Sequence, residues 1–163
     1  MRLHHAALVG VATLAGLALS PTITLAKDEV DVPIPPDRLI EEFRRRFSES
    51  EADILASGGD RMVRRFAGKA GPFPYRTVEL VEVHADAITF EHLSGPFSQC
   101  DERFQFTPVD EGTRITHTGT FQLRGGLWTA PLAIGPVKRA FEAHVHEHLV
   151  AMAAEFNSAR GSE

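Results

Sequence analysis

The segment that most constrains the fold lies near the end of the chain, where residues 137–158 contain neither glycine nor proline. Apolar side chains recur in this segment every three or four residues, which is the spacing of one face of an α-helix. This apolar stripe consists of Val137, Phe141, Val145, Leu149, Met152 and Phe156. We therefore expect one long amphipathic helix, followed by a flexible tail at residues 159–163.

Strand patterns fill the middle of the chain, from Arg61 to Arg124. Apolar and polar residues alternate in five stretches, and turn residues such as Gly71-Pro72 and Gly95-Pro96 separate most of them. The five predicted strands are Arg61–Gly68, Tyr75–Ala85, Ala87–Leu93, Gln99–Pro108 and Thr113–Arg124. Because short connections join antiparallel neighbours, we expect an antiparallel sheet.

The sheet must cover its apolar face, and only one long helix is available to do so. A twisted sheet that curves around a single helix leaves a concave space between the two layers, and ligand pockets form in such spaces. The sequence thus predicts an α+β fold with a cavity beneath the last helix.

The chain before the sheet predicts one strand and two short helices. Residues Asp28–Ile34 alternate between polar and apolar, as in a half-buried strand. Ser48 and Glu51 form a capping-box pattern for the second helix, which Gly58-Gly59 would end. The first helix begins after two prolines, and its apolar side consists of Leu39, Ile40, Phe43 and Phe47.

Length, cysteine content and charge exclude several classes of protein. A chain of 163 residues has room for one sizeable core. Its single cysteine excludes an intramolecular disulfide framework and a zinc site built on several thiolates. With 17 basic and 22 acidic residues the formal net charge is -5, whereas proteins that neutralise nucleic-acid phosphates are usually basic. We therefore expect no nucleic-acid partner.

The first 26 residues have the composition of an export signal. Arg2 is their one Lys or Arg side chain, they contain no acidic residue, and Ala6–Leu19 is an apolar run. Pro21 interrupts the pattern, and the small residue Ala26 precedes the charged Lys27. These features predict a secretory signal peptide. An uncleaved membrane anchor stays open, because the run approaches the roughly 20 residues of a spanning helix when the residues up to Ala26 are counted.

We therefore predict a leader or anchor at residues 1–26, through which the chain associates with a membrane, one domain at residues 27–158, and the tail. The protein is expected to be exported or membrane-anchored. The alternative is a cytoplasmic chain whose first residues form a buried helix.

Four stretches between Glu29 and Phe156 carry a resemblance to a known family: Val30–Leu39, Ile88–Pro96, Phe106–Thr116 and Val137–His144. In these stretches the sequence resembles the SRPBCC or START-like superfamily, in particular its polyketide cyclase/dehydrase and lipid transport group. The resemblance implies a helix-grip fold, in which a curved antiparallel sheet surrounds a long C-terminal helix and two short helices after the first strand close one end.

The sequence departs from this family in one respect. Many members carry a tryptophan between the short helices and the second strand, whereas the single tryptophan of this chain is Trp128, in the segment before the last helix. A fold shared by many functions does not fix the substrate, so none is carried over from the family.

Four polar side chains share a face with apolar residues, namely those of His92, Glu102, His117 and His148. Because an unpaired polar group in apolar surroundings costs roughly 1–3 kcal/mol, we expect them to form a paired cluster. His117, His148 and Glu102 are the candidates for proton transfer, and simple packing with mutual hydrogen bonds is the alternative. The predicted ligand-binding set consists of Phe90, His92, Glu102, Phe104, His117, Phe121, Phe141, Val145, His148 and Met152.

A metal site is a weaker interpretation of the histidines on the last helix. His144 and His148 are four residues apart, so both could reach one ion. A third ligand would have to come from the sheet, with His117 or Glu102 as candidates, and His146 points away from the other two. We therefore expect no metal and no other cofactor.

Two further groups predict structural roles. Cys100 lies alone on an apolar strand face, which is typical of a buried and inert thiol. Arg44, Arg45 and Arg46 predict a solvated helix face, and contact with phosphate or lipid headgroups is the alternative.

No catalytic motif accompanies these residues. The sequence has no glycine-rich phosphate loop, nucleophile elbow or dinucleotide fingerprint. Its 11 phenylalanines and the family resemblance favour a protein that binds or transports a hydrophobic small molecule or lipid by burying its apolar surface. The alternatives are an enzyme similar to polyketide cyclases or aromatases, in which His and Glu groups move protons, and a structural module with a filled interior.

Overall fold

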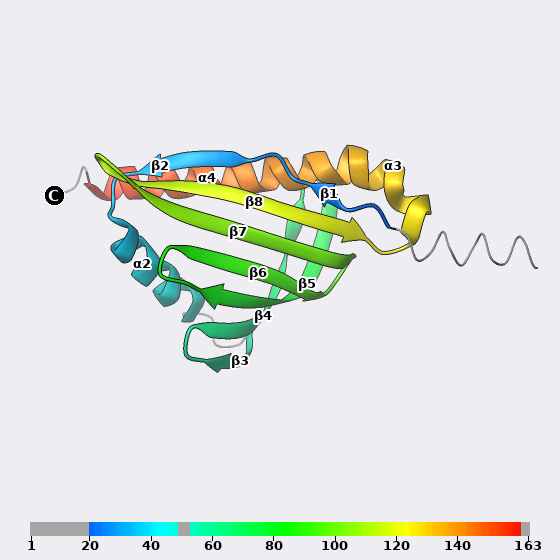
Figure 1. Ribbon diagram of the computed structural model, residues 1–163, viewed down its shortest axis with the longest axis horizontal. Helices are drawn as coiled ribbons and strands as arrows, with labels where there is room; N and C mark the ends of the chain where they lie inside the picture. Colours follow the sequence, from blue (N-terminus) through cyan, green and yellow to red (C-terminus); the bar gives the residue numbers. More distant parts are fainter. Residues whose placement is uncertain (1–19, 49–52, 161–163) are drawn as a thin grey trace, which may run out of the picture.

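A curved sheet wraps around one long helix. The computed structural model describes residues 20–48 and 53–160, and in this part of the chain eight strands form one sheet. The helix α4 (Lys138–Arg160) runs along the concave side, and the helix α2 (Pro36–Ser48) closes one end (Figure 1). The predicted α+β class, with an antiparallel sheet around a C-terminal helix, is confirmed.

The strands follow the order β1-β8-β7-β6-β5-β4-β3, and β2 also pairs with β8. All pairings are antiparallel, and β1 and β2 lie one after the other along the same edge of β8. The strand bounds are β1 Ile23–Thr24, β2 Asp28–Val32, β3 Ile54–Gly58, β4 Arg61–Ala70, β5 Phe73–Val83, β6 Ala87–Ser94, β7 Phe97–Val109 and β8 Gly112–Leu123. Three short helical turns join β8 to α4, namely η2 Gly126–Thr129, α3 Ala130–Leu132 and η3 Ala133–Val137.

Most of the predicted elements are present, and one is wrong. The five strands predicted between Arg61 and Arg124 correspond to β4–β8. The second short helix is not formed where the structure describes it: Ile54–Gly58 is the strand β3, and residues 49–52 lie outside the described residues. Ser48, predicted to cap that helix, is instead the last residue of α2. At the C-terminus α4 extends to Arg160, two residues into the predicted tail.

Strand β8 shows how the sequence specifies the sheet. Thr113, Ile115, His117 and Phe121 share one parity and are buried, as the alternation predicts. The strand begins at Gly112, whose φ of +151° places its α-carbon against β2. A β-carbon at this position would lie 2.0 Å from the carbonyl oxygen of Val32. Glycine is therefore required for β2 to lie against this turn.

The core has two parts. The larger cluster joins the sheet, α2 and α4, and its buried members are Val32, Leu39, Ile40, Val81, Val83, Ile88, Phe106, Ile115, Val145 and Leu149. The smaller cluster consists of Ile23, Leu25, Cys100, Phe121 and Ala133. Ile23 and Leu25 belong to the predicted leader, so its last residues pack in the core of the domain, whereas residues 1–19 lie outside the described residues. Among the residues that are described, no helix combines the length and the apolar character needed to cross a bilayer.

Helix α2 is fixed by aromatic contacts and by one buried arginine. The ring of Phe43 stacks on Phe106 with centroids 5.6 Å apart, and Phe47 meets Phe90 edge to face at 5.9 Å. Arg64 of β4 donates a hydrogen bond to the carbonyl oxygen of Phe47 at 2.9 Å. This bond satisfies a carbonyl in the last turn of α2 that has no partner within the helix.

Candidate functional site

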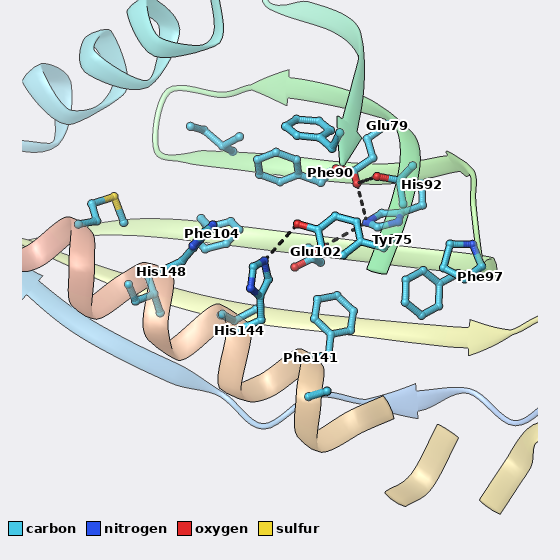
Figure 2. A pocket seen from close by; sticks show the side chains of 18 of the residues that line it. Tyr75, Glu79, Phe90, His92, Phe97, Glu102, Phe104, Phe141, His144 and His148 are labelled. Carbon is cyan, nitrogen blue, oxygen red and sulfur yellow. Dashed lines mark hydrogen bonds and ion pairs between the residues drawn. The ribbon is translucent and has the colours of Figure 1, made fainter. Parts of the chain in front are cut away.

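A cavity of about 680 Å³ lies between α4 and the concave face of the sheet. Its walls are largely aromatic: Phe66, Phe90 and Phe104 come from the sheet, and Phe141 comes from α4. Figure 2 shows the rings of Phe90, Phe104 and Phe141 around a space that also receives several polar side chains. The volume falls within the range of pockets that hold small organic ligands, about 300–1,000 Å³.

Most of the predicted ligand-binding residues meet at this cavity. Strands β6 and β7 and the helix α4 bring them together, although Phe90 and Met152 lie 62 positions apart in the sequence. That they bind a ligand stays a prediction. The members of the predicted set that line the cavity are Phe90, His92, Glu102, Phe104, Phe141, Val145, His148 and Met152.

The structure does not place His117 and Phe121 on the wall of this cavity. His117 is fully buried behind Glu102 and borders a smaller hollow of about 270 Å³ beside Leu25. Phe121 is also fully buried and packs against the ring of Phe141 with centroids 5.7 Å apart. Alternation predicts the face of a strand on which a residue lies, but not whether another side chain covers it.

Four ionisable side chains form a row across four neighbouring strands. Glu79 of β5 pairs in register with His92 of β6, and Glu102 of β7 lies between His92 and His117 of β8. The carboxylate–imidazole distances along the row are 3.3 Å from Glu79 to His92, 3.2 Å from His92 to Glu102 and 3.0 Å from Glu102 to His117. We call Glu79, His92, Glu102 and His117 the acid–base row.

Burial and hydrogen bonding act on this row in opposite directions. Burial raises the pKa of Glu79. Burial alone would also raise the pKa of Glu102, but hydrogen bonds from His117 and His92 bring it below its ordinary value. Burial alone would lower the pKa of His92, but its hydrogen bond to Glu102 and the charge of Glu79 raise it. The row therefore favours an ionised Glu102 beside a protonated His92.

A second polar pair, one residue from β5 and one from α4, faces the cavity. The hydroxyl oxygen of Tyr75 on β5 lies 3.2 Å from Nε2 of His144 on α4 (Figure 2). The His144 ring also lies 4.5 Å from the ring of His148, centroid to centroid. Burial, together with the charge of His148, lowers the pKa of His144. Burial and the charges of Glu79 and Glu102 raise the pKa of Tyr75. Both shifts favour the neutral forms, so a neutral His144 imidazole lies beside a neutral Tyr75 phenol.

Sequence reasoning missed two of these polar residues, Tyr75 and Glu79. Both share the parity of Val81 and Val83, which are buried, so the signal was present in β5. It was masked because Val78 and Leu80 make the other parity of the same strand equally apolar. Such a strand shows no clear alternation, and its inward face cannot be assigned from the pattern alone.

The arrangement of possible metal ligands differs from the predicted one. In the described part of the chain, the three possible metal ligands that lie close together are His92, Cys100 and Glu102. Their ligand atoms lie within 4.8 Å of one another. A cysteine binds metals as a thiolate, whereas burial raises the pKa of the Cys100 thiol. A metal-bound histidine usually donates from its second nitrogen, and Nδ1 of His92 has no hydrogen-bond partner among the described residues. These donors fit a metal ion poorly.

The remaining predicted groups have structural roles. Cys100 is buried in the smaller core cluster, as expected for an inert thiol. Arg44 and Arg45 are exposed and form ion pairs with Asp60 and Glu42, in keeping with a solvated helix face. His146 points away from the cavity and bonds to Asp28 at 2.9 Å. Arg46 differs from its two neighbours, because it lines the cavity at one edge and bridges Glu42 and Glu155.

Comparison with known proteins places this geometry among solved structures. The sequence matches no protein-family model and no curated protein. Its structure is similar to that of a protein from Thermus thermophilus, with a TM-score of 0.65 and 21% identity over 85% of this chain and 99% of the other. It is also similar to the Zhui aromatase/cyclase of a Streptomyces species, with a TM-score of 0.59 and 16% identity over 87% of this chain and 93% of the other.

A third similar structure is a START superfamily protein of Mycobacterium smegmatis, with a TM-score of 0.58 and 12% identity over 85% of this chain and 98% of the other. The chain has the START-like helix-grip fold. The helix-grip neighbours thus include a START superfamily protein and an aromatase/cyclase. At these identities the likeness concerns the fold, and function has to be argued from the site.

Proposed function

We propose that the protein binds a hydrophobic small molecule or lipid in the cavity between the sheet and α4. The observation that carries the proposal is the cavity itself, about 680 Å³ of space with mainly apolar and aromatic walls. Removal of apolar ligand surface from water would drive binding, at about 25 cal/mol per Å². The helix-grip fold of the neighbouring structures supports this proposal at the level of architecture.

Polar groups inside the cavity would orient the ligand. Glu79, His92 and Glu102 line the cavity together with Tyr75 and His144, whereas most of the remaining lining is apolar. Two carboxylates in this group provide hydrogen-bond acceptors and disfavour a negative charge nearby. The proposed ligand therefore has a long apolar part and a polar end that donates hydrogen bonds, such as a hydroxyl group.

The test is a binding titration with the apolar fluorophore N-phenyl-1-naphthylamine, followed by its displacement with long-chain alcohols. Ala140 and Ala151 of α4 line the cavity, so the double variant Ala140→Phe/Ala151→Phe places two rings inside it. We expect the dissociation constant for the probe to rise about ten-fold or more, because overpacking a cavity removes space without removing fold contacts.

The matched control is Ala154→Phe, at an exposed position of the same helix that does not line the cavity. This substitution should leave the affinity for the probe unchanged. The proposal is wrong if the wild-type protein binds no apolar probe, or if filling the cavity and substituting Ala154 have the same effect.

A second candidate function is acid–base catalysis on a polyketide-like substrate in the same cavity. The specific observation in its favour is that two proton-transfer pairs, Glu79–His92 and Tyr75–His144, face one cavity from the sheet and from α4. General acid–base groups contribute about 10²–10⁴-fold to rates when they reach the reacting atoms. One of the structural neighbours is an aromatase/cyclase.

The enzyme candidate makes a different prediction from the carrier. A β-polyketone thioester incubated with the protein should lose water on cyclisation, which mass spectrometry detects. Tyr75→Phe and Glu102→Gln should then lower turnover about 100-fold while the affinity for the apolar probe stays within about two-fold. Absence of turnover together with tight probe binding supports the carrier alone.

A further inference from the structure

Exposed apolar side chains gather at one end of the molecule. Within the described residues, seven large apolar side chains are exposed, and four of them belong to the turns that join β8 to α4. The other three, Leu55, Leu93 and Val150, lie on separate elements. The four in the turns are Leu127, 51% exposed, Trp128, 74%, Leu132, 53%, and Ile134, 61%. We call these four residues the apolar tip.

The apolar tip is held in place by the fold. Gly125 and Gly126 have φ angles of +109° and +66°, which let the chain turn sharply away from β8. The Thr129 hydroxyl then donates a hydrogen bond to the carbonyl oxygen of Gly126 at 2.9 Å. Ala133 is buried between the exposed Leu132 and Ile134. The exposed side chains therefore project from an anchored turn, and concentrated exposed apolar surface of this kind marks an interaction site.

The described chain begins beside the apolar tip. The Ser20 hydroxyl donates a hydrogen bond to the carbonyl oxygen of Leu123 at 2.9 Å, and Ala133 shares a core cluster with Ile23 and Leu25. Figure 1 shows β1 and α3 at the same end of the molecule. The 19 residues before Ser20 contain no acidic side chain and include the apolar run Ala6–Leu19. The described chain therefore begins beside the apolar tip, and the apolar run directly precedes it in the sequence.

The charges near the apolar tip differ from those of the whole chain. The net charge of the chain is -5, yet residues 118–141 contain no acidic residue and three basic ones, Arg124, Lys138 and Arg139. Arg124 and Arg139 are exposed, and Lys138 pairs with Glu142. Basic residues that flank an apolar patch in the sequence are complementary to a membrane surface with anionic headgroups. Tryptophan is enriched in membrane proteins at the depth of the headgroups.

We propose that the apolar tip docks on the surface of a lipid bilayer, with Trp128 and Leu132 at the boundary between headgroups and acyl chains. Leu123 is the last residue of β8 and Val137 the last residue of η3, and both line the cavity. Docking in this orientation would therefore bring one end of the cavity next to the membrane.

The chain offers a site-specific probe of this contact, because Trp128 is its single tryptophan. The full chain is added to vesicles of phosphatidylcholine, with and without phosphatidylglycerol, and the tryptophan emission is recorded. We expect a blue shift, quenching by brominated phosphatidylcholine, and protection from acrylamide, all stronger with phosphatidylglycerol. Emission that stays unshifted and fully accessible to acrylamide while the chain sediments with vesicles would overturn the proposal, since the N-terminal segment alone would then account for binding.

Paired variants separate the apolar tip from general surface hydrophobicity. Leu132→Ser/Ile134→Ser should weaken vesicle binding about ten-fold. The control Leu55→Ser/Leu93→Ser changes two residues of similar exposure on β3 and β6 and should have no effect. Equal binding by both double variants contradicts the proposal. A blue shift that appears without lipid as protein concentration rises also contradicts it, because it would assign the tip to contact between copies of the chain.

Discussion

At the scale of single residues, the acid–base row makes the charge of His92 depend on its neighbours. Its imidazole lies 3.3 Å from one carboxylate and 3.2 Å from another, and all three side chains are at least mostly buried. Because the pKa of His92 is raised in the folded protein, its charged form stabilises the fold below the ordinary imidazole pKa. This contribution is lost as the pH rises through the raised value.

The first prediction follows from the direction in which the pKa of His92 is shifted. His92→Gln should lower the free energy of unfolding by about 3 kcal/mol at a pH below 6.5, the ordinary imidazole value, because two buried carboxylates lose their cation. The loss should shrink at alkaline pH, where the wild-type imidazole is neutral too. Urea unfolding of both proteins at the two pH values measures the difference.

The control for this prediction is His84→Gln, at an exposed histidine whose ring nitrogen lies 3.2 Å from the Thr89 hydroxyl. Its effect should stay within about 0.5 kcal/mol, as for most surface substitutions. A His92→Gln penalty that is identical at acidic and alkaline pH would show that packing, and not charge, determines the role of His92.

At the scale of elements, the local sequence pattern predicts a helix or strand correctly where that element depends only on its own residues. The stripe of α4 and the alternation of β8 are complete within one segment, and both were predicted. Strand β3 was not, because Ile54–Gly58 has no alternation and becomes a strand only by pairing with β4. The leader prediction likewise could not show that Ile23 pairs with Phe121, nearly a hundred residues away.

The residues of the candidate site could likewise be predicted only as far as the local patterns of the strands allow. Alternation predicted the inward faces that carry His92, Glu102 and Phe104, and these residues do line the cavity. Whether a residue of that face reaches the cavity depends on how α4 lies over the sheet. The pattern of a single strand does not predict that placement. His117 therefore lies behind Glu102, and Tyr75, from a strand with two apolar faces, lies opposite His144.

The second prediction concerns the edge formed by β1. Leu25 is 4% exposed and packs in the smaller core cluster, so Leu25→Ala should lower the free energy of unfolding by about 2–4 kcal/mol. The matched control is Leu55→Ala, at a leucine that is 48% exposed, which should cost less than about 0.5 kcal/mol. Urea unfolding measures both.

This prediction bears on processing of the chain. A domain that starts at Lys27 lacks Ile23 and Leu25, whereas one that starts at Ser20 retains both. We expect the longer form to have the higher denaturation midpoint, because both residues are buried in the core. Equal midpoints would mean that β1 adds nothing to the fold, and a cleavage site at Ala26 would then carry no cost in stability.

At the scale of the whole molecule, the cavity links stability to ligand binding. The fold keeps about 680 Å³ between the sheet and α4, although interiors are otherwise packed like organic crystals. A ligand that occupies this space binds the folded chain and not the unfolded one. It should raise the free energy of unfolding by about 2.7 kcal/mol at a ligand concentration 100 times the dissociation constant.

The charge of the cavity wall predicts which ligands stabilise the folded protein most. A long-chain alcohol should stabilise the protein more than the carboxylic acid of equal chain length at neutral pH, because the acid brings a third carboxylate close to Glu79 and Glu102. Burial, and to a smaller extent the charge of Glu102, raises the pKa of Glu79, so this wall already disfavours a negative charge. Glu79→Gln removes one carboxylate and should narrow the gap between the two ligands, as measured by thermal unfolding across a ligand series. If the acid stabilises the wild-type protein as well as the alcohol does, the polar end of the ligand lies away from the acid–base row, and the orientation proposed for it is wrong.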